Sequence, residues 1–226
     1  MIKPYYETKL GKLYHGDCLE IMPELEPVDL VLTDPPWNMG YFKGDKDEWS
    51  QYCEKLKKWV KISLIGKNQI IFQSSKSISH TSSIFEGWMP FIAVKNFSQM
   101  NPKHLPNCFD IAYIRNNEFY KGNGRNWFLS NTAGMLRQRN EHPTPRAEDV
   151  MMYLLDIFDA QKICDPFLGS GTTAIACERL KRKWIGIEIE EKYCEIAAKR
   201  IEENLTVIEK IERSEKGITK KTGLLF

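Results

Sequence analysis

The sequence lacks the features that mark several classes of protein. No two of its cysteines are spaced as Cys-x-x-Cys, so zinc ribbons and dithiol redox motifs have no support. No apolar run is long enough to cross a membrane, and the N-terminus has no apolar signal-peptide core. No internal repeat is visible. We therefore expect a cytoplasmic protein with reduced thiols, no membrane contact and no bound metal.

Charge of one sign does not dominate the chain. Its 226 residues include 32 basic and 30 acidic ones, with a net charge of +2. The distribution is uneven, because residues 95–146 contain eight basic and three acidic residues, which gives this segment +5 and the remainder −3. A basic segment of this kind is typical of a nucleic-acid interface. The length and the apolar fraction of 42% indicate a single globular domain over residues 1–226.

One glycine-containing segment organises the C-terminal half of the chain. It follows an apolar strand predicted over 162–164, and it precedes a helix predicted over 172–181. Strand, glycine turn and helix form the nucleotide-binding arrangement of doubly wound α/β proteins. A second strand, 183–187, leads to Glu188, whose carboxylate could accept hydrogen bonds from both ribose hydroxyls. The segment reads Asp165-Pro166-Phe167-Leu168-Gly169-Ser170-Gly171-Thr172-Thr173.

Two classes of nucleotide fit this segment. Gly169-x-Gly171-x-x-Ala174, with an acidic residue about 20 positions on, also matches the dinucleotide fingerprint. A pyrophosphate on this turn would face the carboxylate of Asp165, whereas the sulfonium and ammonium groups of S-adenosylmethionine suit that charge. No lysine follows the second glycine, which argues against a P-loop. A strand, turn and helix with no ligand is the remaining alternative.

A second segment carries groups suited to chemistry on a base. An apolar strand predicted over 28–33 ends in Asp34-Pro35-Pro36-Trp37. An exocyclic base amine is a poor nucleophile, because its lone pair is delocalised into the ring. The Asp34 carboxylate and the Pro35 carbonyl could hold its two hydrogens, while prolines fix φ and remove competing N–H donors. Trp37 offers a flat face to an extruded base. An ordinary Pro-Pro turn is the alternative.

These two motifs, in this order, resemble those of the beta class of amino-methylating DNA methyltransferases. The resemblance covers most of residues 10–204. It implies a Rossmann-like α/β fold in circularly permuted order, whose sheet is mostly parallel with an antiparallel end. It also implies S-adenosylmethionine as cofactor and DNA as partner, with Asp34, Pro35, Pro36 and Trp37 as catalytic residues. At the cofactor it places Asp17, Asp34, His142, Asp165, Pro166, Phe167, Gly169, Ser170, Gly171, Thr172, Thr173 and Glu188.

Two of these residues have a competing structural role. Asp17 matches a strand-end carboxylate that contacts the adenine of the cofactor in the family, but it could equally cap a helix predicted over 19–25. His142 begins His-Pro-Thr-Pro-Arg, which departs from the His-Pro-Thr-Gln-Lys-Pro common in the family. A local hydrogen bond is therefore the alternative role of His142.

The target base follows from the residues and from the resemblance. No Pro-Cys dipeptide is present, which removes the covalent route of 5-methylcytosine enzymes. In the family, Asp-Pro-Pro-aromatic accompanies adenine N6 and Ser-Pro-Pro more often cytosine N4, so Asp34 favours adenine N6 in DNA. Cytosine-N4 DNA methylation, RNA-adenine methylation and a non-catalytic nucleic-acid-binding partner subunit stay open as alternatives.

The rest of the chain predicts a DNA-contacting segment, possible partners and further helices and strands. A DNA-contacting insertion is expected at about 96–140, with 116–139 irregular and with Arg125 and Trp127 available to hold phosphates and to stack on bases. A solvated insertion is the alternative. Beta-class relatives are often dimers, and a restriction enzyme can accompany them, so both partners are expectations from the family. Apolar spacing predicts helices over 48–64, 147–158 and 191–211 and strands over 12–15, 69–72, 91–94 and 110–114.

Overall fold

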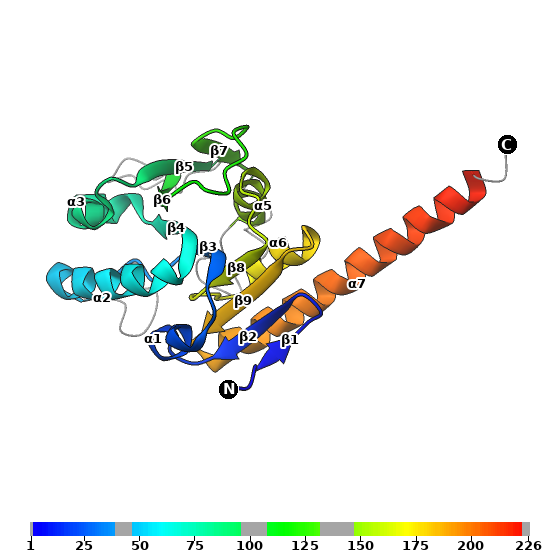
Figure 1. Cartoon of the computed structure of the whole chain (residues 1–226), viewed down its shortest axis with the longest axis horizontal. Coiled ribbons are helices and arrows are strands. Elements are labelled where there is room, and N and C mark those ends of the chain that lie inside the picture. Colours follow the sequence, from blue (N-terminus) through cyan, green and yellow to red (C-terminus); the bar gives the residue numbers. More distant parts are fainter. Residues whose placement is uncertain (1, 39–46, 96–107, 132–146, 223–226) are drawn as a thin grey trace, which may run out of the picture.

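One twisted sheet runs through the centre of the protein (Figure 1). The computed structural model describes residues 2–38, 47–95, 108–131 and 147–222. Within these residues nine strands pair in the order β1-β2-β9-β8-β3-β4-β6-β5-β7. The strands are β1 (Tyr6–Glu7), β2 (Gly11–His15), β3 (Val28–Thr33), β4 (Gly66–Gln73), β5 (Met89–Lys95), β6 (Phe109–Arg115), β7 (Trp127–Ser130), β8 (Lys162–Asp165) and β9 (Lys183–Glu188).

The helices connect these strands and cover both faces of the sheet. Packing contacts place α5, α6 and α7 on one face and α1, α2 and α3 on the other. The α-helices are α1 (Cys18–Ile21), α2 (Trp49–Ile62), α3 (Ile78–Thr81), α5 (Glu148–Ile157), α6 (Thr172–Arg179) and α7 (Glu191–Thr222). Short 3-10 helices are η1 (Met22–Glu24), η2 (Ser63–Ile65), η3 (Ser75–Ser77) and η4 (Ser82–Phe85).

The strand directions confirm the predicted fold class. The five strands β2, β9, β8, β3 and β4 run parallel to one another, and the two-residue strand β1 pairs antiparallel with β2 at one edge. Beyond them, β6 lies antiparallel to both β4 and β5, while the edge strand β7 pairs in parallel with β5. The sheet is therefore mostly parallel with an antiparallel end, and the strand that precedes the Asp34 motif comes before the glycine motif in the chain.

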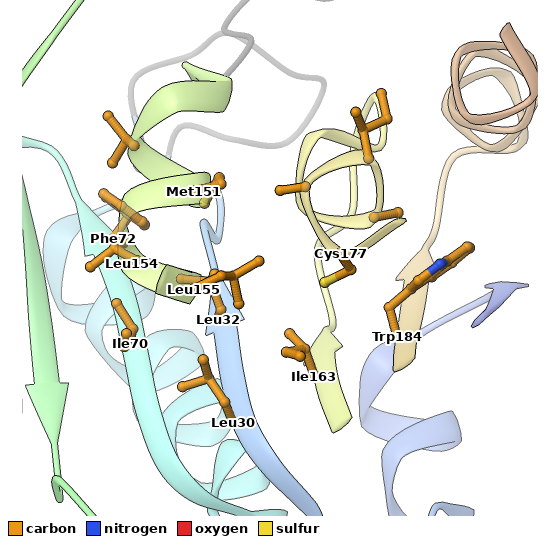
Figure 2. Close-up of a cluster of buried hydrophobic side chains, with 14 of the residues drawn as sticks. Leu30, Leu32, Ile70, Phe72, Met151, Leu154, Leu155, Ile163, Cys177 and Trp184 are labelled. Carbon is orange, nitrogen blue, oxygen red and sulfur yellow. The ribbon is translucent and has the colours of Figure 1, made fainter. Parts of the chain in front are cut away.

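Alternating apolar side chains fix the central strands between the two helical layers. Leu30 and Leu32 of β3 point to the face covered by α5 and α6, whereas Val31 between them packs with α1 on the other face. Figure 2 shows Leu30 and Leu32 beside Leu155 of α5 in this buried cluster. A strand that is buried on both faces reads as a continuous apolar run, which is why the sequence located β3 correctly.

Two elements differ from the sequence prediction. The edge strand β7 lies inside 116–139, which was expected to be irregular. It has four residues, and among them Phe128 packs toward the core against Tyr153, with ring centroids 4.6 Å apart. Helix α7 continues to Thr222, past the expected end at residue 211, and its distal part extends away from the sheet (Figure 1). Among the described helices none has both the length and the apolar character that a membrane span requires.

Candidate active site

The two predicted motifs meet at the carboxyl ends of two neighbouring strands. Strand β3 leads into the 34–37 turn, and its neighbour β8 leads into the 165–173 turn, with Val31 opposite Cys164. From β8 the chain continues to β9 on one side, whereas β3 pairs with β4 on the other side. This is a topological switch point, the position at which open α/β sheets form a ligand-binding crevice.

Asp165, the last residue of β8, is held by three hydrogen-bond donors. Its Oδ1 accepts hydrogen bonds from the Thr33 hydroxyl (2.7 Å) and the Phe167 N–H (3.1 Å), and its Oδ2 accepts one from the Thr173 hydroxyl (2.6 Å). Burial raises the pKa of this carboxyl from 3.8 to about 6; the three hydrogen bonds oppose the rise and the charge of Asp34 adds to it. Asp165 thus organises the turn and places a buried negative charge under it.

The glycines of the 165–173 turn are required by its geometry. Gly169 and Gly171 have φ values of 55° and 86°, in the left-handed region that favours glycine. A Cβ on Gly171 would also lie 3.1 Å from the Cβ of Ala197 in α7. Gly171 is the N-cap of α6, so the first N–H groups of that helix face the end of the turn. The side chains of Thr172 and Thr173 are buried there.

Glu188 at the end of β9 closes the other side of the turn. Its Oε2 accepts from the Gly169 N–H (2.8 Å), and its Oε1 accepts from the Glu190 N–H (2.9 Å). Burial raises the pKa of the Glu188 carboxyl, and the N–H donors oppose that rise. Each carboxylate oxygen can accept a second hydrogen bond, so this arrangement remains compatible with ribose hydroxyls. Asp17 lies at the end of the adjacent strand β2, where its Oδ1 caps α1 by accepting from the Leu19 N–H (2.8 Å).

The 34–37 turn is partly accessible and is anchored by α2. Pro35 is buried, whereas Asp34, Pro36 and Trp37 are half-buried. The hydroxyl of Tyr52 donates a 2.9 Å hydrogen bond to the Pro36 carbonyl oxygen. Three side chains of the turn are therefore partly accessible, while its main chain is tied to the core.

A contact between aromatic rings joins α2 to the 165–173 turn. The ring of Trp59 meets that of Phe167 edge to face, with centroids 4.9 Å apart. Helix α2 thus contacts both turns, the 34–37 turn through Tyr52 and the 165–173 turn through Trp59.

Other predicted site residues are placed as follows. His142 lies outside the described residues. Trp127, at the amino end of β7, is 46% exposed, and the Arg125 guanidinium lies 5.4 Å from its ring centroid in a cation–π contact. Over the described ranges no cluster of three or more His, Cys, Asp or Glu side chains is arranged to hold a metal ion.

Three residues near the two turns had no role assigned from the sequence. Thr33 could have been noticed as the polar residue that ends an apolar strand directly before Asp34. Tyr52 and Gln73 gave no such signal, because Tyr52 falls on the apolar face of an amphipathic helix and Gln73 at the end of a buried strand.

A mostly parallel sheet with a glycine turn, a strand-end glutamate and an Asp-Pro-Pro-Trp turn at one switch point is the arrangement expected of a methyltransferase that uses S-adenosylmethionine. The profile of the DNA methylase family matches residues 66–199, which is more than half of the chain. The chain belongs to this family, and the family resemblance inferred from the two motifs is confirmed.

Individual relatives agree with this assignment. The chain is 28% identical to the Type II methyltransferase M2.LlaDCHI of Lactococcus lactis subsp. cremoris, over 91% of this chain and 94% of that protein. Among solved structures, the M1.HpyAVI complex with S-adenosylmethionine is 26% identical, with a TM-score of 0.63 over 85% of this chain and 99% of that one. The PvuII cytosine-N4-specific DNA methyltransferase shares the fold, with 17% identity and a TM-score of 0.68 over 90% and 94% of the two chains.

These matches confirm two further predictions at the level of the family. The protein is a DNA methyltransferase of the N6/N4 amino-methylating type. The cofactor of this family is S-adenosylmethionine, as the sequence predicted.

Proposed function

We propose that this protein transfers a methyl group from S-adenosylmethionine to the exocyclic N6 amine of adenine at a specific DNA sequence. The observation that carries the proposal is the hydrogen bond between Thr33 and Asp165. It fixes the turn that bears Asp34 beside the turn that bears the glycines. A methyl donor on one turn and a base amine on the other would then be neighbours, which is the proximity that group transfer requires.

The residues of the 165–173 turn fit this cofactor. Buried carboxyls of Asp165 and Glu188 give the turn a negative potential, which favours a ligand with ammonium and sulfonium groups over one with phosphates. In the proposal, Glu188 accepts hydrogen bonds from the ribose, and the glycines let the main chain approach the ligand closely. Asp17, Asp34, His142, Pro166, Phe167, Ser170, Thr172 and Thr173 would complete the cofactor site.

The 34–37 turn would activate the amine. S-adenosylmethionine, when bound, supplies an electrophilic methyl group. Asp34 and the Pro35 carbonyl would accept the two amine hydrogens, which favours a pyramidal nitrogen with a localised lone pair. Asp34 or water would take the proton that the nitrogen loses. Pro36 rigidifies the turn, and Trp37 would stack on the extruded base, offsetting part of an extrusion cost of a few kcal/mol.

Adenine is favoured over cytosine by the identity of Asp34. The Asp-Pro-Pro-aromatic form of the motif accompanies adenine N6 in the family, and serine is more frequent with cytosine N4. Cytosine N4 is the second candidate, supported by the shared fold with the PvuII cytosine-N4-specific enzyme. Two alternatives would replace both of these DNA methylation candidates. One is methylation of adenine in RNA, and the other is a role as a non-catalytic partner subunit.

The proposal assigns DNA contacts to the basic segment. A single domain over 1–226 would contact the duplex through residues 96–140, with Arg125 and Trp127 at the described part of that surface. If these residues hold phosphates, the affinity of the protein for DNA should fall steeply as the salt concentration rises.

The enzyme would act in the cytoplasm. We also expect a homodimer and a companion restriction enzyme. The molar mass measured by sedimentation in solution distinguishes monomer from dimer.

One experiment tests the proposed reaction. The protein is incubated with methyl-labelled S-adenosylmethionine and unmethylated mixed-sequence DNA, which is then digested to nucleosides for mass spectrometry. Label on N6-methyladenine is the expected result. Label on N4-methylcytosine would retain the mechanism and change the base, whereas label only on supplied RNA would change the substrate. Absence of label despite cofactor binding would contradict the catalytic proposal.

A further inference from the structure

Tyr52 reaches the 34–37 turn from a fixed position in the core. Its hydroxyl donates to the Pro36 carbonyl oxygen at 2.9 Å, and its side chain is only 2% exposed. The ring packs edge to face against Trp49 and Trp59 of the same helix, with centroid distances of 5.8 and 6.5 Å. Because these contacts immobilise the ring, the direction of the hydroxyl is set by the fold rather than by the turn.

The turn needs such an external donor. Pro35 and Pro36 have no N–H, so the main chain between Asp34 and Trp37 can be held there only through its carbonyl groups or by side chains. Upstream, Thr33 is tied to Asp165. Tyr52 supplies the hydrogen bond to the middle of the segment.

Downstream, a second anchor holds the chain directly after Trp37. The side chain of Asn38 donates to the Asp47 carbonyl (3.0 Å) and accepts from the Asp47 N–H (2.6 Å). Asp47 is in turn paired with Lys55 of α2 at 2.7 Å. Helix α2 therefore supports the turn at its middle and at its exit.

Holding the Pro36 carbonyl also orients the groups on either side of it. The carbonyl shares a rigid peptide plane with the Trp37 N–H, so the direction in which Trp37 leaves the turn is set. The φ of Pro36 is locked near −65°, which leaves one torsion between this plane and the one that contains the Pro35 carbonyl. A single hydrogen bond at Pro36 thus restricts both the Pro35 carbonyl and the Trp37 ring.

Gln73 favours donation from Tyr52 to Pro36. The carboxamide of Gln73 lies 3.2 Å from the Tyr52 oxygen and 3.4 Å from the Ser77 hydroxyl oxygen through Oε1, and its Nε2 is buried without a partner among the described residues. Half a turn of the carboxamide places Nε2 toward both hydroxyl oxygens as a donor. Tyr52 has one proton, and with Gln73 donating to it that proton goes to Pro36.

We propose that Tyr52 is a positioning residue for methyl transfer, which acts by fixing the Pro36–Trp37 peptide. Its hydroxyl aims the Pro35 carbonyl at the amine and the Trp37 ring at the base. This inference rests on the proposed function for its catalytic consequence. Its structural part, the restraint of the turn, can be measured without any reaction.

The test compares Tyr52→Phe with Tyr113→Phe. Both tyrosines are buried on the same face of the sheet, and the Tyr113 ring stacks on Phe85 at 4.3 Å, but within the described residues its hydroxyl makes no hydrogen bond. Tyr52→Phe should raise the hydrogen-exchange rate of the Trp37 amide and lower kcat for DNA methylation, each about tenfold, as loss of one hydrogen bond implies. The dissociation constant of S-adenosylmethionine should change less than twofold. Tyr113→Phe should leave all three unchanged.

Two readouts separate this inference from the proposed function. If the wild-type protein methylates no DNA, the proposed function fails, while exchange at Trp37 still decides whether Tyr52 restrains the turn. An unchanged Trp37 exchange rate in Tyr52→Phe would overturn the inference whatever the kinetics. Equal losses in both variants would also overturn it, since they would indicate general packing. Gln73→Met provides a second variant, and it should shift Trp37 exchange in the same direction as Tyr52→Phe.

Discussion

The hydroxyl of Thr33 donates a 2.7 Å hydrogen bond to Oδ1 of Asp165, across 132 residues of sequence. Thr33 directly precedes the 34–37 turn, and Asp165 begins the 165–173 turn. The bond is buried and joins the ends of β3 and β8 at the switch point of the sheet. It is therefore the link that sets the spacing between the amine-binding and cofactor-binding parts of the proposed site.

Thr33→Val should weaken both the fold and the reaction. The substitution keeps the shape of the side chain but leaves a buried carboxylate oxygen with one donor fewer. We expect the free energy of unfolding to fall by about 1–3 kcal/mol and kcat to fall about tenfold. Urea unfolding and methylation kinetics measure the two effects. Thr33→Ser, which retains the hydroxyl, is the control, and equal behaviour of the two variants would show that the bond is unimportant.

Asp165 should make stability depend on pH in an unusual direction. Its pKa in the folded protein, about 6, lies above its ordinary value of 3.8, so the folded state binds this proton more tightly than the unfolded state. Stability from this group is then fully present below about pH 4 and is lost as pH rises through about 6. The free energy of unfolding of Asp165→Asn, compared with that of the wild type at the same pH, should therefore rise by up to about 3 kcal/mol from pH 4 to pH 7.

The control for this prediction is Asp34→Asn. The charge of Asp34 contributes to the raised pKa of Asp165. Removing that charge should therefore bring the pKa of Asp165 closer to its ordinary value and narrow the pH range over which the protein loses stability through Asp165. Urea unfolding at several pH values measures the three proteins. A difference between Asp165→Asn and wild type that stays constant from pH 4 to pH 7 would show that the carboxyl is not perturbed by burial.

The sequence was sufficient for most of the sheet because strong local patterns coincide with its core. Strand β3 was predicted to the residue, since an apolar run bounded by proline and acidic residues has few other solutions. The edge strand β7 was missed because its four residues lie among asparagines and glycines. Its pairing with β5 is a long-range property that no local pattern contains.

The sequence identified the two segments that the structure brings together, but not the hydrogen bonds that join them. The two motifs were recognisable from their residues, and the expected S-adenosylmethionine cofactor follows from the family. The sequence did not indicate that both oxygens of Asp165 and both oxygens of Glu188 accept bonds from the protein itself. Partners of this kind lie up to 132 residues apart, so they appear only once the strands are ordered.

Glu188→Gln should weaken cofactor binding and stability together. An amide can accept at one position only, so either the Gly169 N–H or the Glu190 N–H would face an NH2 group. We expect S-adenosylmethionine affinity to fall about tenfold and the melting temperature to drop by several degrees, on the scale of about 1–2 kcal/mol. Isothermal titration and calorimetry measure these changes. The exposed neighbour Glu190→Gln is the matched control, and loss of affinity in both variants alike would remove the special role of Glu188.

Asp34→Asn should separate binding from chemistry. Asparagine has nearly the same size, but it presents an NH2 donor at one of the positions where the carboxylate would accept an amine hydrogen. We expect kcat for DNA methylation to fall at least about a hundredfold, as when one group that stabilises the transition state is removed, while S-adenosylmethionine still binds. Labelled methyl transfer and calorimetric titration measure the two quantities. The exposed Asp156 of α5 offers a control substitution, Asp156→Asn, with no expected effect on either. Undiminished methylation by Asp34→Asn would show that the amine is activated by other groups, and the mechanism proposed for the 34–37 turn would then be wrong.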